Sequence, residues 1–318
     1  MKQELATKKI KKKEKAQEIS VYDAPLWVKG IAYFITSVLA ISAILPFLLT
    51  VAISFTDEAS IMAKGYSLFP EKFSLEGYKY LFTNGAQIAR SYGVTIFITI
   101  VGTLGGLLVI SLLAYVISRP SFPWRKQFTF VALFTMLFSG GLLPSYIINT
   151  TVYQYRDNIH ALIIGHLMNT TYLLIMRTYM ANSIPGAVIE SAKIDGAKDF
   201  TCYWKIVLPM ATPVLGTIGI FLVVAIWNDW YTGFLYITSN TDIMPIQLLL
   251  QRMEKEVQFL QNNAAQMGAS EVMAVQATLP SETFRMCLVV IVVTPILVAY
   301  PFFQRFFVNG ITIGSVKG

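Results

Sequence analysis

Six long stretches without a charged side chain constrain this chain more than any other feature of its sequence. A helix needs about 20 residues to cross the hydrocarbon core of a bilayer, and these stretches are 19 to 29 residues long. With 14% charged residues, the chain also carries too little charge to cover a soluble surface. The sequence therefore predicts an all-α membrane protein with six transmembrane helices, at about 31–55, 91–117, 127–149, 159–180, 209–238 and 285–306.

The placement of lysine and arginine gives these helices a direction. If the N-terminus lies inside, 17 of the 25 basic residues fall on the cytosolic side, in line with the positive-inside bias. Seven lysines crowd the first 15 residues; a nucleic-acid-binding arm is conceivable, but a tail that fixes topology explains them more simply. We expect a basic cytosolic tail over 1–28, a transmembrane domain over 29–318, and N- and C-termini that are both cytosolic.

The longest outer loop, 239–284, has a helical pattern of its own. Apolar residues recur at helical spacing at Leu249, Met253, Val257 and Leu260. This spacing predicts an amphipathic helix over Ile246–Met267 on the outer surface. Such a helix would either contact an extracytoplasmic partner or cap the helical bundle.

Glycines and prolines inside the apolar stretches predict how the helices pack and bend. The glycines indicate close helix packing rather than a nucleotide-binding loop, because no strand precedes them. The prolines predict kinks in their helices. The glycines are Gly102, Gly105, Gly106, Gly216 and Gly219, and the prolines are Pro46, Pro144, Pro213 and Pro295.

Residues that carry catalytic or metal chemistry are few. Two cysteines and two histidines make neither a disulfide framework nor a zinc site. The sequence G-x-x-x-x-G-K-[ST] does not occur, so the chain should not bind ATP itself. We expect no catalytic residue, no metal site and no cofactor in this chain.

One cytosolic loop, 183–208, has the pattern of a docking element. It reads as two short amphipathic pieces around Gly196, which permits a turn that a side chain would obstruct. Ser183 can cap the first piece, with Pro185 in its first turn, and Pro209 begins the next membrane helix. A bent helix pair with small residues at its bend suits a groove on another protein.

The same loop resembles the EAA motif of ABC importer permeases, which is Glu-Ala-Ala, three residues, Gly, nine residues, Ile, one residue and Leu-Pro. Glu190-Ser191-Ala192, Gly196 and Ile206-Val207-Leu208-Pro209 keep every spacing, and Ser191 is the one departure. The resemblance implies the type I ABC importer permease fold and makes Glu190 the ion-pair partner of an ATPase arginine. It assigns ATPase coupling to Glu190, Ser191, Ala192, Asp195, Gly196, Ala197, Ile206, Leu208 and Pro209.

Three further stretches resemble the carbohydrate group of these permeases. WNDWYTGFLYI (227–237) and the glycine-rich tail 307–318 are similar to the smaller maltose-transporter permease, and FSGGLLPSY (138–146) resembles the branch for complex or uronate-containing oligosaccharides. The resemblance implies a multi-pass permease subunit of the bacterial cytoplasmic membrane that translocates an oligosaccharide. Its expected partners are a second homologous permease, an ATPase dimer that holds ATP and Mg²⁺, an extracytoplasmic sugar-binding lipoprotein and the lipid bilayer.

The resemblance also suggests two further groups of site residues. The tail residues Gly314, Val316, Lys317 and Gly318 would reach the ATPase dimer. A sugar path would be lined by Trp227, Asn228, Asp229, Trp230 and Tyr231, because rings stack on sugar faces and amides bond hydroxyl groups; alternatively, these residues form an aromatic belt at the outer interface.

Two other functions remain open at this point. The first is an importer of the same architecture for a non-sugar solute. The second is an integral-membrane enzyme such as a glycosyltransferase, which would need clustered carboxylates or a metal site. The acids Asp157, Asp195, Asp199 and Asp229 are scattered along the sequence instead.

Overall fold

The computed structural model describes residues 25–83, 85–263 and 282–315, and these residues form two compact units, one within 1–74 and one within 75–318. Most of the predicted basic tail lies outside the described residues.

The first unit consists of a long apolar helix and a short hairpin-like segment. Helix α2 (Leu26–Ser54) contains Pro46, and helix α3 (Glu58–Lys64) follows it directly. After α3 the chain turns back, so that the ring of Phe73 stacks on that of Phe55 at 5.5 Å. Lys64 and Glu71 form an ion pair at 2.7 Å across this turn.

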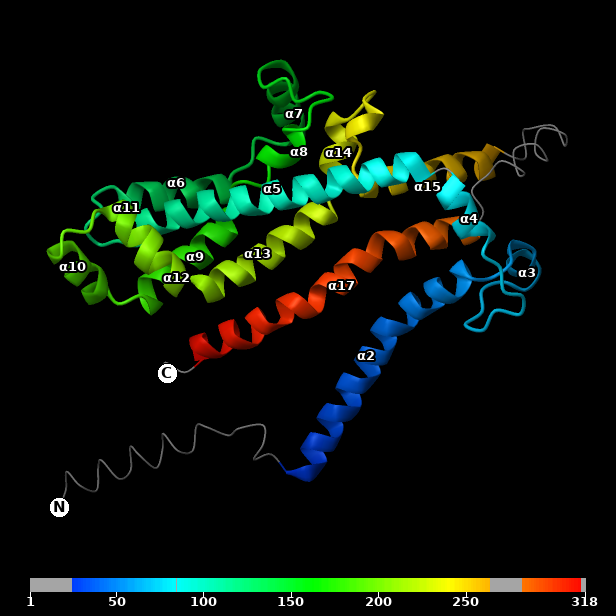
Figure 1. The fold of residues 1–318 in the computed structure, drawn as a ribbon, viewed down its shortest axis with the longest axis horizontal. Helices are drawn as coiled ribbons and strands as arrows, with labels where there is room; N and C mark the ends of the chain where they lie inside the picture. Colours follow the sequence, from blue (N-terminus) through cyan, green and yellow to red (C-terminus); the bar gives the residue numbers. More distant parts are fainter. Residues whose placement is uncertain (1–24, 84, 264–281, 316–318) are drawn as a thin grey trace. The chain divides into compact units, whose positions relative to one another are not determined.

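The second unit is helical throughout its described part (Figure 1). Its long central helix α5 (Gly85–Ser118) packs against α9 (Thr170–Ser183) and α13 (Thr212–Trp227), and α13 packs in turn against α17 (Glu282–Ser315). The remaining elements are α4 (Glu76–Thr83), α6 (Arg125–Leu137), α7 (Leu142–Thr151), α8 (Ala161–Ile164), α10 (Gly186–Ile194), α11 (Asp199–Cys202), the π-helix η2 (Tyr203–Val207), α12 (Leu208–Met210), α14 (Tyr231–Tyr236), the 3-10 helix η3 (Thr241–Ile243) and α15 (Ile246–Asn263).

Gly102, Gly105 and Gly106 of α5 lie at close contacts with neighbouring segments, which confirms the close packing predicted for them from the sequence. A Cβ atom on Gly102 would come within 2.8 Å of Ile226 Cδ1, and one on Gly106 would come within 3.0 Å of the His166 carbonyl oxygen. These separations are shorter than ordinary van der Waals contact, so the helices can approach closely only because the side chains are missing.

Two of the described helices, α2 and α5, are long and apolar enough to cross a membrane, and up to four spans result if each of two bent pairs counts as one. Helices α6 and α7 meet at 111°, where Gly141 has φ +90°. The segment Asp199–Met210 and helix α13 meet at 79°, next to Pro213. The stretch 159–180, expected to be one helix, is divided into α8 and α9.

Two details of the predicted docking loop are wrong. Ser183 does not cap the first piece; it is the last residue of α9, and Pro185 is the N-cap residue of α10. Pro209 does not begin the next helix, because the chain is already helical from Asp199. A proline in the first turn of a helix costs no hydrogen bond, which is why Pro209 suggested a helix start. The helical turns before Pro209 gave no such signal in the sequence.

Helix α15 confirms the predicted amphipathic helix over Ile246–Asn263; residues 264–267 lie outside the described residues. Ile246 and Leu248 are fully buried against the rest of the unit. The Ile246 amide donates to Thr95 Oγ1 at 2.9 Å, which ties the start of α15 to α5. The start of α15 is therefore packed against its own unit.

Candidate functional site

The docking loop is a bent pair of helices, α10 and α11, at one end of the second unit (Figure 1). The bend is at Gly196, which has φ +86°. L-residues avoid this region because their Cβ approaches the following carbonyl oxygen. The Ala197 amide donates to the Ala192 carbonyl at 2.9 Å and closes the end of α10. The turn that the sequence predicts at Gly196 is confirmed.

The outer side of this pair presents charge and apolar surface together. Glu190, Ser191, Asp195 and Gly196 are exposed, and the Ile194 side chain is 86% exposed at the end of α10. An isoleucine this far exposed costs free energy in water unless a partner covers it. We call the surface formed by 188–200 the coupling surface.

The inner side of the coupling surface is anchored to the bundle. Ile189 is buried in the same core as Met180 and Tyr203. The Tyr203 hydroxyl is 2.7 Å from Ser111 Oγ, which joins η2 to α5. Lys193 and Asp199 form an ion pair at 2.7 Å across the bend, and this hydrogen bond raises the pKa of Lys193. The bend is therefore packed against the bundle and is not a free loop.

The remaining predicted coupling residues lie within the coupling surface or just after it. Ala192 and Ala197 are half-buried and pack against the core. Ile206 and Leu208 are half-buried, whereas Pro209 is exposed. All nine predicted residues lie on the stretch of chain that runs from α10 through α12.

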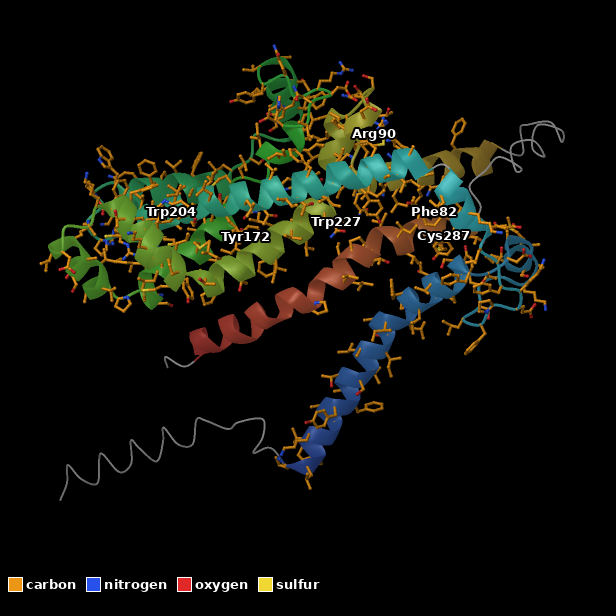
Figure 2. The ribbon with its side chains drawn as sticks, in the orientation of Figure 1. Phe82, Arg90, Tyr172, Trp204, Trp227 and Cys287 are labelled. Atoms are coloured by element: carbon orange, nitrogen blue, oxygen red, sulfur yellow. The ribbon has the colours of Figure 1, made fainter. Side chains whose placement is uncertain are left out.

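Trp227, the first predicted sugar-path residue, is buried where α13 meets α17. Its Nε1 donates to the Val292 carbonyl at 3.3 Å, and its ring lies 6.3 Å from that of Tyr92. Figure 2 shows Trp227 at the far end of α13 from Trp204, which marks the coupling surface end. In this conformation the Trp227 indole joins helices and does not face an open surface.

Asn228 and Asp229 form the break between α13 and α14. Asn228 is exposed, and its Oδ1 accepts from Gln247 Nε2 at 3.2 Å. Asp229 Oδ2 lies 2.9 Å from His166 Nε2, and Asp229 Oδ1 accepts from the Thr232 amide at 2.9 Å. His166 comes from the irregular segment between α8 and α9, so this pair joins two breaks in the bundle.

Trp230 and Tyr231 begin α14 and lie in an aromatic group. Their ring centroids are 5.7 Å apart, and Tyr231 is 43% exposed. The ring centroids of Phe234 and Trp230 are 6.0 Å apart. The Lys255 ammonium lies 4.2 Å from the centroid of the Phe234 ring. The Lys255 ammonium over the Phe234 ring is a cation–π contact.

The sequence reasoning missed a second aromatic group, between α7 and α14. Tyr236 stacks on Tyr146 at 5.9 Å and meets Tyr155 edge-on at 5.7 Å. Asn149 Nδ2 donates to the Tyr236 hydroxyl at 2.7 Å. The tyrosines at 146, 153 and 155 were a visible signal in the sequence, but nothing there placed them beside residue 236.

Of the predicted tail residues, Gly314 lies within the described part of the chain. Gly314 lies in the last turns of α17, and Val316, Lys317 and Gly318 lie outside the described residues. Within 25–83, 85–263 and 282–315 there is no group of three or more His, Cys, Asp or Glu residues that could hold a metal ion.

Comparisons with known proteins cover most of the chain. Residues 120–313 match the family described as binding-protein-dependent transport system inner membrane component. The polygalacturonan/rhamnogalacturonan transport system permease protein YtcP of Bacillus subtilis (strain 168) is 35% identical over 279 residues, 88% of this chain and 94% of that protein. Protein LplC of the same organism is 36% identical over 275 residues, 86% of this chain and 90% of that protein.

The fold is also similar to that of a solved structure. A chain in the crystal structure of a bacterial ABC transporter involved in the import of the acidic polysaccharide alginate matches with a TM-score of 0.76 and 25% identity. The match covers 91% of this chain and 98% of that chain.

Proposed function

This chain belongs to the family of binding-protein-dependent transport system inner membrane components, and from that premise we propose that it carries an acidic oligosaccharide across a bacterial cytoplasmic membrane. The family predicted from the EAA resemblance is confirmed, and so is the function of a permease subunit in an oligosaccharide ABC importer. Subunits of this kind have no ATPase site of their own, so another subunit supplies the energy.

The acidic character of the substrate is supported by two exposed cations, one of which lies beside an exposed aromatic ring. Lys255 lies against Phe234, and the exposed Arg156 lies next to Thr238, with Nε and Oγ1 at 3.5 Å. Rings can stack on sugar faces, and these cations can pair with uronate carboxylates. The polygalacturonan/rhamnogalacturonan permease and the alginate importer point to the same substrate class.

We further infer the partners and the topology. A second, homologous permease would complete the path, an ATPase dimer with its own ATP and Mg²⁺ would bind the coupling surface, and an extracytoplasmic sugar-binding lipoprotein would deliver the substrate. Six spans with both termini in the cytosol agree with the placement of lysine and arginine. ATP then drives transport because it binds the closed ATPase dimer more tightly than the open one.

One observation carries the coupling mechanism: an exposed, charged and apolar bend that is anchored inside to α5 and α9. Glu190 and Ile194 face outward from it, and Ile189 and Tyr203 fix its inner side. A partner that binds the outer side would therefore pull on the membrane helices through the core.

The test compares substitutions in the coupling surface of the assembled importer. Glu190→Lys reverses the charge that would pair with an ATPase arginine, and Gly196→Asp places a side chain at φ +86°. Both variants should abolish oligosaccharide uptake and transport-stimulated ATP hydrolysis while the protein remains in the membrane.

Gly186→Asp is the matched control. A Cβ on Gly186 or on Gly196 would meet nothing within 4 Å, but only Gly196 has a positive φ. Gly186→Asp should therefore retain most of the uptake. Normal uptake in both Glu190→Lys and Gly196→Asp would contradict the coupling role.

A further inference from the structure

A pocket of about 260 Å³ opens beside the coupling surface, at the end of α5. Tyr115, Arg119 and Phe122 line one side of it, and the ion pair of Lys193 with Asp199 lines the other. The pocket thus lies between the loop that follows α5 and the bend of the coupling surface. It lies apart from the two aromatic groups near α14.

The side chain of Arg119 lines this pocket, and two of its donors have no acceptor among the described residues. Its guanidinium lies 4.9 Å from the centroid of the Tyr115 ring. Its Nε and Nη2 atoms are buried, and no described residue accepts a hydrogen bond from either of them. Burial also lowers the pKa of Arg119. A half-buried cation without an anionic partner loses part of its hydration, so an anion bound in the pocket would stabilise this arrangement.

The charged side chains that line the pocket leave a net charge of one positive unit, which suits an anion with one negative charge. Lys193 and Asp199 neutralise each other at 2.7 Å, which leaves the guanidinium of Arg119 as the unbalanced charge. A guanidinium presents its N–H groups in a fixed fork that fits two oxygens of one phosphate or carboxylate.

The position of the pocket favours a lipid as the source of that anion. Arg119 directly follows Ser118, the last residue of the long apolar helix α5. Trp124 is 58% exposed just beyond the pocket, and the exposed ring of Phe128 packs on Phe122 at 5.7 Å. Tryptophan and arginine beside the end of a membrane span are typical of the depth of the lipid headgroups.

We propose that this pocket binds the phosphodiester of an anionic phospholipid, with Arg119 donating to its oxygens. The site goes beyond the transport function, and the inferred topology places its lipid in the cytosolic leaflet. A lipid bound here would touch both the end of α5 and the bend of the coupling surface. Basic pockets at the cytosolic ends of membrane helices bind anionic headgroups in this way.

The test measures how the purified, complete importer retains phosphatidylglycerol during delipidation, by native mass spectrometry. The wild type should keep phosphatidylglycerol in preference to phosphatidylcholine. Arg119→Gln should weaken this retention about tenfold, and Arg119→Lys should weaken it less because the charge remains. Lys126→Gln is the matched control, since it removes one exposed positive charge from the same region and should leave retention unchanged.

Several outcomes would overturn the proposal. Equal retention of the two lipids by the wild type, or unchanged retention in Arg119→Gln, would exclude a phosphodiester site. An equal loss in Lys126→Gln would indicate diffuse charge attraction. Displacement of the lipid by millimolar inorganic phosphate would identify a site for free phosphate. Loss of the ATPase subunit from Arg119→Gln, with lipid retention unchanged, would identify a protein carboxylate as the partner. Thermal unfolding of each variant verifies that it is folded.

Discussion

Asp157 holds a whole loop through a single carboxylate. It accepts five hydrogen bonds, from the amides of Thr238, Ser239 and Asn240 and from the hydroxyls of Thr238 and Ser239. Its own amide donates to the Tyr236 carbonyl at 2.8 Å, and its φ is +53°. The hydrogen bonds from Asn240 and Thr238 hold the pKa of Asp157 well below its usual range. The segment after α7 is thereby fixed to the segment after α14.

Asp157→Asn should lower the thermal stability of the purified protein at neutral pH, because the amide accepts fewer and weaker hydrogen bonds. The stabilisation by a carboxylate of lowered pKa is present above its ordinary pKa of about 3.9 and is lost as the pH falls below that value. The gap in unfolding temperature between wild type and variant should therefore be constant from pH 7 to 5 and shrink below pH 4.

Asp242→Asn is the control for Asp157→Asn. The Asp242 carboxylate lies in the same part of the chain, but it is exposed and pairs with the single side chain of Arg90. Exposed pairs of this kind contribute little, about 0–1 kcal/mol. A gap for Asp157→Asn that persists unchanged at pH 3 would show that its charge does not hold the loop.

The contacts between α5 and its neighbours depend on positions without a side chain. A Cβ on Gly106 would come within 3.0 Å of the His166 carbonyl oxygen and 3.2 Å of Leu222 Cδ1. The carbonyl oxygen belongs to the backbone of the segment between α8 and α9, so it cannot rotate away as a side chain can. The absence of a side chain at Gly106 therefore determines how closely α5 approaches both α13 and the segment between α8 and α9.

Gly106→Val should destabilise the protein by about 1–3 kcal/mol, the usual cost of overfilling a packed interior. Gly93→Val is the matched control in the same helix, because a Cβ at Gly93 meets nothing within 4 Å. Both variants change helix propensity equally, so the difference between them reports the contact. Unfolding temperatures in detergent would measure it, and equal values would mean that the contact does not form.

The sequence could predict which segments are apolar helices, but not where they break. The α6–α7 bend lies at Gly140-Gly141, and Asn169 caps α9 by accepting from the Tyr172 amide at 3.2 Å. Both signals were present in the sequence, yet counting uncharged residues registers only hydropathy and not the direction of the backbone. The turn at Gly196 was predictable because a glycine between two amphipathic pieces permits a turn that a side chain would obstruct. The unpartnered donors of Arg119 were not, since they depend on segments that are distant in sequence.

At the scale of the whole molecule, the placement of basic residues predicts on which side of the membrane each loop lies. If both termini are cytosolic, the loop 57–90 lies outside and the coupling surface lies inside. The chain offers a clean way to test this, because both of its cysteines, Cys202 and Cys287, are buried. A membrane-impermeant maleimide should therefore leave the folded wild-type protein unlabelled.

Single cysteines introduced at exposed positions would then report the side on which each loop lies. Ala63→Cys in α3 should react with the maleimide in cells whose cell wall has been removed and whose cytoplasmic membrane is intact. Ala187→Cys in α10 should react only after the membrane is made permeable, because the coupling surface must meet the ATPase in the cytosol. The opposite pattern would invert the topology and separate the coupling surface from ATP. Labelling of both cysteines in intact cells would place the two loops on one side, which an odd number of spans between them forbids.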